Sequence, residues 1–296
     1  MKHVTIAGAG TLGAQISWQT AFKGFEVTVY DIDKDGLETG KRFHREFAEL
    51  FLEKRGASQE EIDNTFGRIT YTTNLAEAVT NADIVSESIP EKLEIKKSFY
   101  KELAKLAPPE TIFTTNTSSL LPSEFAAETG RPDKFLAMHF ANRIWDARVA
   151  EVMQHEGTDR IVFDKTVAFV REIGLIPIPI YKEHRGYVLN SLLIPFLSAA
   201  TNLLVEGVTD HETIDKTWMV CTGVKVGPLG ILDLVGLETM YNVCISQGAI
   251  SGDKSMLKRA EFVKENFINK GKLGIKTGEG FYSYPNPRYT SDNFLN

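Results

Sequence analysis

The sequence predicts an α/β fold in two parts: a doubly wound sheet with a helical-hairpin excursion, followed by an all-α C-terminal domain. An apolar strand, a glycine-rich turn and an amphipathic helix open the chain. Short β-branched runs then alternate with helical segments as far as residue 180, and beyond residue 186 the pattern is helical with no clear strand. We therefore expect two domains, 1–183 and 184–296, which suits a chain of 296 residues.

The opening stretch carries a dinucleotide-binding fingerprint. A strand is expected at Val4–Ala7, a helix from Leu12 to Phe22 and a second strand at Phe25–Tyr30, with GAGTLG between the first strand and the helix. In this Rossmann-type unit one glycine allows the tight turn, one lets the pyrophosphate approach the backbone, and one lets the helix pack on the strand. The residues expected to hold the cofactor here are Gly8, Gly10, Thr11, Leu12 and Gly13.

The acidic residue at the tip of the second strand, Asp31, indicates which dinucleotide binds. A carboxylate there accepts hydrogen bonds from the ribose hydroxyls and repels a 2′-phosphate, so NAD is favoured over NADP. The alternative is a glycine-rich turn that binds no nucleotide. Strand, glycines, helix, second strand and acid in one order argue against it.

An excursion follows the second strand. The segments Lys34–Arg55 and Ser58–Gly67 read as two helices, and Ser58 with Glu61 forms a capping box for the second. A minimal βαβ unit does not need this hairpin, so we expect it to serve the substrate.

The remaining elements follow from apolar runs and their periodicity. Further strands are expected at Ile69–Thr72, Ala82–Ser88, Thr111–Thr115, Phe135–Phe140, Val149–Met153 and Ile176–Ile180, and further helices at Asn74–Thr80, Leu93–Leu106, Ser123–Glu128, Asp164–Ile173, Val188–Leu204, Thr209–Gly223, Pro228–Gly236 and Glu238–Ser246. The Val188–Leu204 helix is apolar around much of its girth, which indicates burial in a bundle or at a subunit interface. The polar tail from Pro285 is expected to be partly disordered.

Composition excludes several classes of function. A net charge of −6 argues against a nucleic-acid partner. The two cysteines, Cys221 and Cys244, show no metal-ligand spacing, so we expect no metal. A strand begins almost at once and no apolar run reaches about 18 residues, so we expect neither a signal peptide nor a membrane span, and a cytoplasmic location.

Oxidation of a carbinol by NAD needs a base, and histidine suits that role because its pKa lies near neutrality. Of the six histidines, His139 alone ends a strand at the expected cofactor edge. Glu151, twelve residues on in a neighbouring strand, would fix the imidazole tautomer. From spacing alone, a core histidine and an unrelated surface glutamate remain equally open. Glu91 and Lys96 follow another strand and are expected near the cofactor.

These residues belong to a longer set of motifs. The set comprises GAGTLG, NTSSL at Asn116–Leu120, HF-x-N at His139–Asn142, VAEVM around Glu151, GYVLN at Gly186–Asn190, GP-x-x-x-LD-x-VGL from Gly227, and TGEGFY at Thr277–Tyr282. In this order the chain resembles the L-3-hydroxyacyl-CoA dehydrogenase family, including the short 3-hydroxybutyryl-CoA dehydrogenases, over nearly its whole length.

The resemblance implies hydride transfer between an L-3-hydroxy and a 3-keto group with NAD. It implies His139 as general base with Glu151 as its partner, and Ser118 and Asn190 as hydrogen-bond donors near the substrate oxygen and nicotinamide. The positions that match the family's NAD contacts are Glu91, Lys96, Ser118, Asn142 and Lys276. It further implies a homodimer formed through the C-terminal domain.

The sequence also departs from the family. The proline-rich loop after the histidine is replaced by residues that include Arg143, Trp145 and Arg148, and Arg185-Gly186-Tyr187 replaces Pro-Gly-Phe. Phe47 stands where a CoA-contacting serine is usual, although Lys54 keeps the matching lysine. Glu46, Glu49 and Glu53 make that helix a poor host for CoA phosphates.

Two alternatives therefore stay open. The HFAN-x-x-W pattern and DKTW at Asp215–Trp218 resemble a diketoreductase-like branch acting on CoA-free dioxo esters, in which Arg143, Arg148 or Arg185 would bind a free carboxylate. A non-catalytic NAD-binding structural protein is the other. A lysine base is a weaker possibility, because Lys182 lies at the domain hinge without a matching motif.

Overall fold

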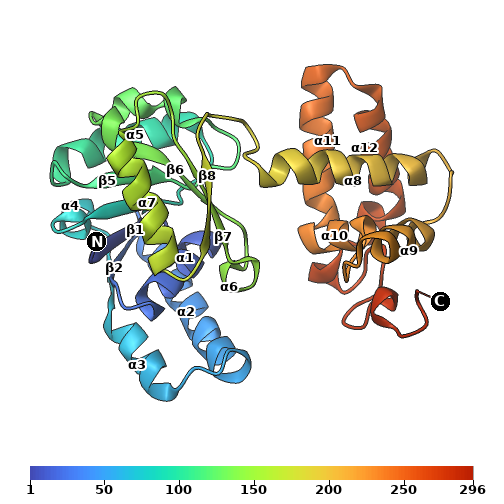
Figure 1. Ribbon diagram of the computed structural model, residues 1–296, viewed down its shortest axis with the longest axis horizontal. Helices are drawn as coiled ribbons and strands as arrows, with labels where there is room; N and C mark the ends of the chain where they lie inside the picture. The colour runs from blue at the N-terminus through green and yellow to red at the C-terminus, as the bar shows by residue number, and fades with distance from the viewer. Residues whose placement is uncertain (296) are drawn as a thin grey trace. The chain divides into compact units, whose positions relative to one another are not determined.

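The computed structural model describes residues 1–295, apart from the side chains at positions 247, 250 and 251. Two compact units make up the chain, Met1–Val188 and a second from Leu189 onward (Figure 1). The first unit extends beyond the expected boundary at residue 183. It does so because the Tyr187 hydroxyl and the Val188 N–H donate hydrogen bonds to Thr117 and Glu151.

The first unit is built on an eight-stranded sheet in the order β3-β2-β1-β4-β5-β6-β7-β8. Neighbouring strands run parallel except β6 and β7, which are antiparallel. Each strand predicted from the sequence is present, with its ends within two residues of the expected ones. The strands are β1 (His3–Ala7), β2 (Glu26–Tyr30), β3 (Ile69–Thr72), β4 (Ile84–Glu87), β5 (Ile112–Thr115), β6 (Phe135–Phe140), β7 (Val149–Met153) and β8 (Ile176–Ile180).

Helices cover both faces of this sheet, as expected for a doubly wound fold. One buried apolar cluster joins the sheet to α1 (Thr11–Phe22), α2 (Lys34–Lys54), α3 (Gln59–Gly67), α6 (Ile144–Ala147) and α7 (Arg160–Glu172). A second cluster joins it to α4 (Leu75–Val79), α5 (Leu93–Leu106) and, through Phe125 and Ala126, the 3₁₀ turn Ala126–Thr129. Another 3₁₀ turn, Pro122–Glu124, precedes it. The strands β1, β4, β5, β6 and β7 are therefore buried almost throughout, whereas β2, β3 and β8, toward the two ends of the sheet, are only partly buried.

The predicted excursion is the hairpin of α2 and α3, which projects from the body of the first unit (Figure 1). Its capping is as expected: Ser58 accepts from the Glu61 N–H, and the Glu61 side chain accepts from the Ser58 N–H. The hairpin packs on α1 through Trp18, whose ring lies 5.9 Å from that of Phe51. Beside this contact, the fully buried His44 bonds to Ser17 of α1 and to the Tyr71 hydroxyl of β3.

The second unit is helical in the order α8 (Leu189–Val205), α9 (His211–Thr222), α10 (Pro228–Val235), α11 (Leu237–Ser251) and α12 (Lys254–Asn266). Two buried carboxylates tie its loops together. Asp215 accepts from the N–H groups of Leu229 and Gly230, and Asp233 accepts from those of Phe281 and Tyr282. Burial raises the pKa of both carboxyl groups, although their hydrogen bonds oppose it.

Several expected details of the chain are wrong. The helix expected from Asp164 begins at Arg160, because Asp159 caps it by accepting from the Ile161 N–H. Ser123 caps no helix; it lies inside a 3₁₀ turn, and its N–H donates to Glu183. The short helix α6 and the amphipathic α12 were not expected.

The C-terminal tail is also packed rather than disordered over its described part. Tyr289 and Phe294 are 8% and 2% exposed and belong to the apolar core of the second unit. The burial of these two aromatic side chains favours a packed tail, although the residues around them are polar.

No single helix within residues 1–295 is long and apolar enough to cross a membrane. Only α10 and the first part of α11 taken together reach that length and composition, and the angle between these two helices is 91°.

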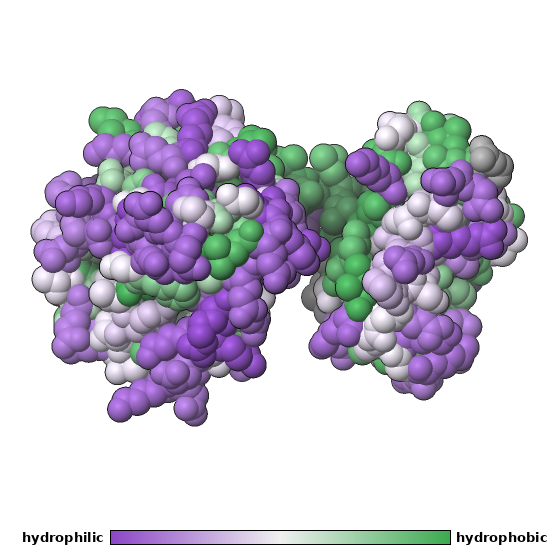
Figure 2. Space-filling model, turned by 90° about the horizontal axis from the view of Figure 1, so that it is seen from below, coloured by the Kyte–Doolittle hydropathy of each residue, from purple (hydrophilic) through white to green (hydrophobic). Residues whose placement is uncertain are grey.

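Apolar side chains also reach the surface of the second unit (Figure 2). On α8, Leu192 is 69% and Leu203 43% exposed.

Candidate active site

The carboxyl-end side of the sheet holds a histidine–glutamate pair. His139 and Glu151 are direct cross-strand partners in the antiparallel pair of β6 and β7. Their side chains meet, with 2.9 Å between His139 Nδ1 and Glu151 Oε2. Both are nearly buried, at 6% and 3% exposed. Because Glu151 accepts at Nδ1, the proton of the neutral imidazole is held there and Nε2 is left as the acceptor.

The free nitrogen of this imidazole faces a serine. Ser118 Oγ lies 3.2 Å from His139 Nε2, and Ser118 itself is exposed at the end of β5. The structure thus brings together three of the predicted site residues, Ser118, His139 and Glu151. A substrate hydroxyl placed between Ser118 Oγ and Nε2 would meet one hydrogen-bond donor and one base.

Glu91 holds the loop that carries Ser118. Its Oε1 accepts from the backbone N–H groups of Ser118 and Ser119, both at 3.0 Å, and from the hydroxyls of Thr117 and Ser119. Burial alone would raise the pKa of Glu91, but these hydrogen bonds and the nearby charge of Lys96 outweigh it and lower that pKa. Glu91 therefore stays ionised as a clamp on the loop.

Lys96 is more deeply placed than expected for a direct cofactor contact. Its side chain is 1% exposed, and Nζ lies 2.6 Å from Glu87 Oε1 and 3.3 Å from Glu91 Oε2. Glu87 is fully buried and accepts from the Thr115 hydroxyl as well. Lys96 therefore forms ion pairs with both Glu87 and Glu91 and supports the position of Glu91. Any contact of Lys96 with NAD stays a prediction.

The glycine-rich turn has the shape that a pyrophosphate needs. A Cβ on Gly8 would lie 2.5 Å from the Ser88 carbonyl oxygen, and a Cβ on Gly13 only 1.8 Å from the Gly8 oxygen. Gly10 is different, because a Cβ there would meet open space. Gly10 also starts α1 without any side-chain cap, so the first N–H groups of that helix point outward beside Thr11 and Leu12.

Asp31 lies where a ribose would reach it. It directly follows β2, and its Oδ2 accepts from the Ala9 N–H at 2.8 Å. Gly36 leaves room for the carboxylate, since a Cβ at that position would lie 2.5 Å from Asp31 Cγ. These residues fit NAD, and the turn together with Asp31 would hold it.

Asn142 is hydrogen-bonded to Gln15 of α1, the helix that follows the glycine-rich turn. Its Oδ1 accepts from Gln15 Nε2 at 2.7 Å and from the Arg143 N–H at 2.9 Å. Gln15 Oε1 in turn accepts from the same Arg143 N–H. Arg143 adopts a left-handed conformation, with φ of 59°, which these bonds hold in place.

The three arginines proposed to bind a carboxylate are each occupied. Arg143 pairs with Asp146, Arg148 donates to the Gly174 carbonyl, and Arg185 binds both the Ser119 carbonyl and Glu124. Arg185 alone among them contacts the loop that carries Ser118. The binding of a substrate carboxylate by Arg143, Arg148 or Arg185 stays a prediction.

Three expected site residues belong to other elements of the chain. Lys54 is exposed at the end of α2. Asn190 lies in the first turn of α8 and Lys276 in the 3₁₀ turn Ile275–Thr277, both in the second unit. Their contacts with substrate and cofactor stay predictions.

The sequence missed Gln15, Glu87 and Tyr187. The Tyr187 ring stacks on the His139 imidazole, with 4.6 Å between centroids and 26° between planes. Gln15 and Glu87 are polar residues within otherwise buried elements, at 4% and 0% exposed. A polar side chain inside a predicted buried helix or strand is the signal that would have pointed to them.

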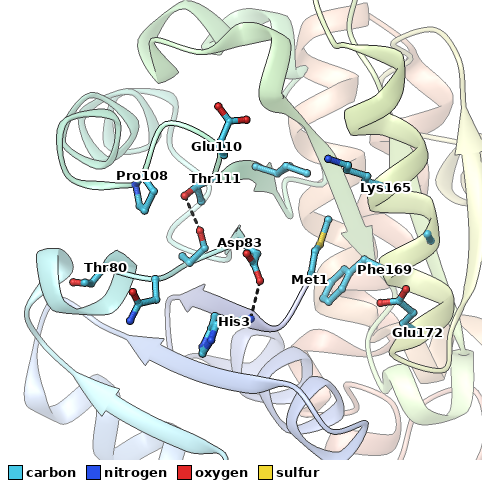
Figure 3. Close-up of a pocket in the computed structure, with 14 residues that line it drawn as sticks. Met1, His3, Thr80, Asp83, Pro108, Glu110, Thr111, Lys165, Phe169 and Glu172 are labelled. Carbon is cyan, nitrogen blue, oxygen red and sulfur yellow. Dashed lines mark hydrogen bonds between the residues drawn. The ribbon is translucent and has the colours of Figure 1, made fainter.

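A hollow of about 680 Å³ lies at the other edge of the sheet, at the amino ends of the strands (Figure 3). Asp83 lines it and accepts from the backbone N–H groups of Lys2 and His3, while Thr111 donates to the Ala82 carbonyl. The side chains of Asp83 and Thr111 thus form hydrogen bonds with the backbone. The pair of His139 and Glu151 lies at the opposite edge of the sheet. Within residues 1–295, no group of His, Cys, Asp and Glu is arranged to hold a metal.

The chain matches known proteins over nearly its whole length. Residues 3–184 match the 3-hydroxyacyl-CoA dehydrogenase NAD-binding domain, and residues 186–284 match the C-terminal domain of the same family. A probable 3-hydroxybutyryl-CoA dehydrogenase of Bacillus subtilis is 32% identical over 96% of this chain and 98% of its own.

Solved structures are similar over the same length. One of them is a diketoreductase, whose structure is described under substrate-directed dual catalysis of dicarbonyl compounds. It is 48% identical to this chain, and the match covers 96% of this chain and 99% of the diketoreductase chain, with a TM-score of 0.91. The (S)-3-hydroxybutyryl-CoA dehydrogenase of Ralstonia eutropha is 28% identical, with a TM-score of 0.84 over 97% and 100%. The chain therefore belongs to the 3-hydroxyacyl-CoA dehydrogenase family and is an NAD-dependent oxidoreductase of that type.

Proposed function

We propose that the protein interconverts an L-3-hydroxy group and a 3-keto group, with His139 as the base and acid. The observation that carries this proposal is the buried pair of His139 and Glu151 with Ser118 opposite the free imidazole nitrogen. NAD, when bound, accepts or supplies the hydride. The chain's own residues handle the proton and the charge on the substrate oxygen.

In the oxidative direction, His139 Nε2 takes the hydroxyl proton of the substrate. Glu151 stabilises the resulting imidazolium through Nδ1, and its other oxygen is already satisfied by the Val188 N–H at 2.8 Å. Ser118 donates to the substrate oxygen as negative charge develops on it. In the reductive direction the charged imidazole returns the proton to that oxygen.

The family supports a coenzyme A thioester as substrate, but the contacts around Phe47 in this chain support a CoA-free substrate instead. Phe47, at the position of the CoA-contacting serine, packs on Trp145 with 4.8 Å between ring centroids and stacks on Phe43 at 6.0 Å. Asp146, next to Trp145, is paired with Arg55 just after α2. The excursion is thus bound to the loop after the histidine by apolar and charged contacts, and its aromatic surface suits an apolar dicarbonyl better than phosphates.

The experiment is NADH oxidation with acetoacetyl-CoA, free acetoacetate and a dioxo ester at matched concentrations. A kcat/KM for acetoacetyl-CoA higher by orders of magnitude supports the acyl-CoA dehydrogenase and a role in fatty-acid metabolism. CoA-free substrates that match or exceed it support the diketoreductase-like alternative. NADH oxidation with none of the three contradicts the proposed chemistry.

A homodimer through the second unit is part of the same proposal. Only Leu197, Ala200 and Thr201 of α8 are buried, although most of its 17 residues are apolar. A second copy covering Leu192 and its exposed neighbours would bury this surface. Light scattering should give the mass of two chains, and Leu192→Glu should shift the mass toward that of one chain. A monomer in both cases contradicts the proposed homodimer.

A cytoplasmic location stays an expectation that localisation of the tagged chain would test.

A further inference from the structure

The last two residues of the first unit both contact the histidine–glutamate pair. The Tyr187 ring stacks on the His139 imidazole, with 4.6 Å between the ring centroids. The Val188 N–H donates to Glu151 Oε1, the oxygen that does not face the histidine. Consecutive residues of one segment thus contact one member each of the pair.

Tyr187 has a second anchor, on the loop that carries the serine. Its hydroxyl donates to the Thr117 carbonyl at 2.7 Å, one residue before Ser118. The ring contact and this hydroxyl bond together span from the imidazole to the neighbour of Ser118. Tyr187 is therefore placed to maintain the 3.2 Å separation between Ser118 Oγ and His139 Nε2.

The backbone of this segment is unusual and tightly held. Tyr187 has φ of 55°, a left-handed conformation that bulky residues seldom adopt, and Gly186 before it has φ of 84°. Tyr187 is also only 2% exposed. Such a conformation persists where surrounding contacts over-determine it. Here those contacts include the His139 ring and the Thr117 carbonyl of the candidate site, together with the His184 carbonyl, which accepts from the Tyr187 N–H.

We propose that Tyr187 is a positioning residue that orients the His139 imidazole and sets its distance from Ser118, with the Val188 N–H fixing Glu151 from the same segment. This rests on the proposed function of His139 as the base. A base misplaced by about 1 Å costs roughly 10²-fold in rate, so the loss of a ring that packs against the imidazole should be visible in kcat.

The test compares Tyr187→Phe, which keeps the ring and removes the hydroxyl, with Tyr187→Leu, which removes both. Steady-state rates are measured in H₂O and D₂O with the best 3-keto substrate. We expect kcat to fall about fivefold in Tyr187→Phe and about 10²-fold in Tyr187→Leu, with KM for NADH within about twofold of the parent. The solvent isotope effect should rise in both, because proton transfer becomes slower.

Tyr71→Phe is the matched control. Tyr71 is also a hydrogen-bonded tyrosine of the first unit, but its hydroxyl bonds to His44 and not to the site. It should keep the parent's kcat and isotope effect. Unchanged kcat in Tyr187→Leu overturns the proposal. So does a fall in kcat that matches a loss of folded protein and leaves the isotope effect unchanged.

A second measurement does not depend on turnover. Nitrogen-15 NMR of the histidine rings, with the His139 signals assigned from His139→Gln, reports which ring nitrogen carries the proton. We expect a single tautomer with the proton on Nδ1 in the parent, and a mixture or broadened signals in Tyr187→Leu. Identical His139 signals in the two proteins overturn the positioning role. A parent that oxidises no NADH, with the tautomer still dependent on Tyr187, contradicts the proposed function alone.

Discussion

His139 and Glu151 face each other directly across the one antiparallel strand pair of the eight-stranded sheet, and their side chains meet at 2.9 Å. The pair is therefore a product of strand register rather than of a loop. A shift by one residue would turn Glu151 to the other face of the sheet. The same register brings its second oxygen to the Val188 N–H, so both oxygens are satisfied in a nearly water-free setting.

Replacing Glu151 with Gln should lower kcat by roughly 10²–10⁴-fold. The amide cannot stabilise the imidazolium, and its NH₂ group favours the wrong imidazole tautomer. KM for NADH should stay close to the parent, because Glu151 lies away from the glycine-rich turn. Steady-state kinetics with an unfolding curve as control measure this, and an unchanged kcat would remove Glu151 from the mechanism.

Asp31→Ser should weaken selection for NADH over NADPH. The variant loses a charged acceptor for ribose hydroxyls and the repulsion of a 2′-phosphate, so KM for NADH should rise about tenfold while that for NADPH falls. Asp33→Ser, at the exposed cap of α2, is the control and should leave the cofactor ratio unchanged. If the ratio of KM for NADPH to KM for NADH is the same in the parent and in Asp31→Ser, another group selects the dinucleotide.

His44 should make the first unit less stable in acid. Burial lowers the pKa of His44 to about 4, so the unfolded chain, with an ordinary pKa near 6.5, takes up the proton first as pH falls. The histidine's contribution is complete above about pH 6.5 and should shrink by about 2 kcal/mol by about pH 5. Urea unfolding of the parent and His44→Gln at about pH 7.5 and about pH 5 checks this. Equal pH dependence in both proteins would be inconsistent with a buried neutral His44.

Asp233→Asn should destabilise the second unit by about 2–4 kcal/mol. The carboxylate accepts from Phe281 N–H, Tyr282 N–H and the Tyr284 hydroxyl, and an amide would turn an NH₂ group toward donors. Asp253→Asn, at the exposed cap of α12, should cost about 1 kcal/mol or less. Chemical denaturation of both variants gives the comparison, and equal losses would mean that the buried network contributes little.

The sequence predicted the parts of the fold that local pattern determines. The order of the strands along the chain, the capping box at Ser58 and the helix Leu93–Leu106 follow from periodicity and capping, and the structure confirms them. The helix expected from Thr209 begins at His211 instead, because Asp210 caps it by accepting from the Thr213 N–H. Such small errors at helix ends arise because capping is decided by φ and ψ, which the pattern does not give.

The parts of the site that escaped prediction depend on contacts between distant segments. Tyr187 reads as one aromatic residue in a turn, and only the fold brings its ring onto His139. Lys96 matched a cofactor position, yet burial beside Glu87 gives it an ion-pair role that spacing could not reveal. The contact between the rings of Trp145 and Phe47 likewise forms only because the excursion packs on α1.

The most direct test of the account is the rate of NADH oxidation by the parent and by His139→Gln with the same 3-keto substrates, together with NADH binding by fluorescence. We predict turnover by the parent, a loss of about 10³-fold or more in kcat for His139→Gln, and NADH affinity within about twofold. An active His139→Gln protein would contradict the assignment of His139 as the base and, with it, the mechanism built on the β6–β7 pair.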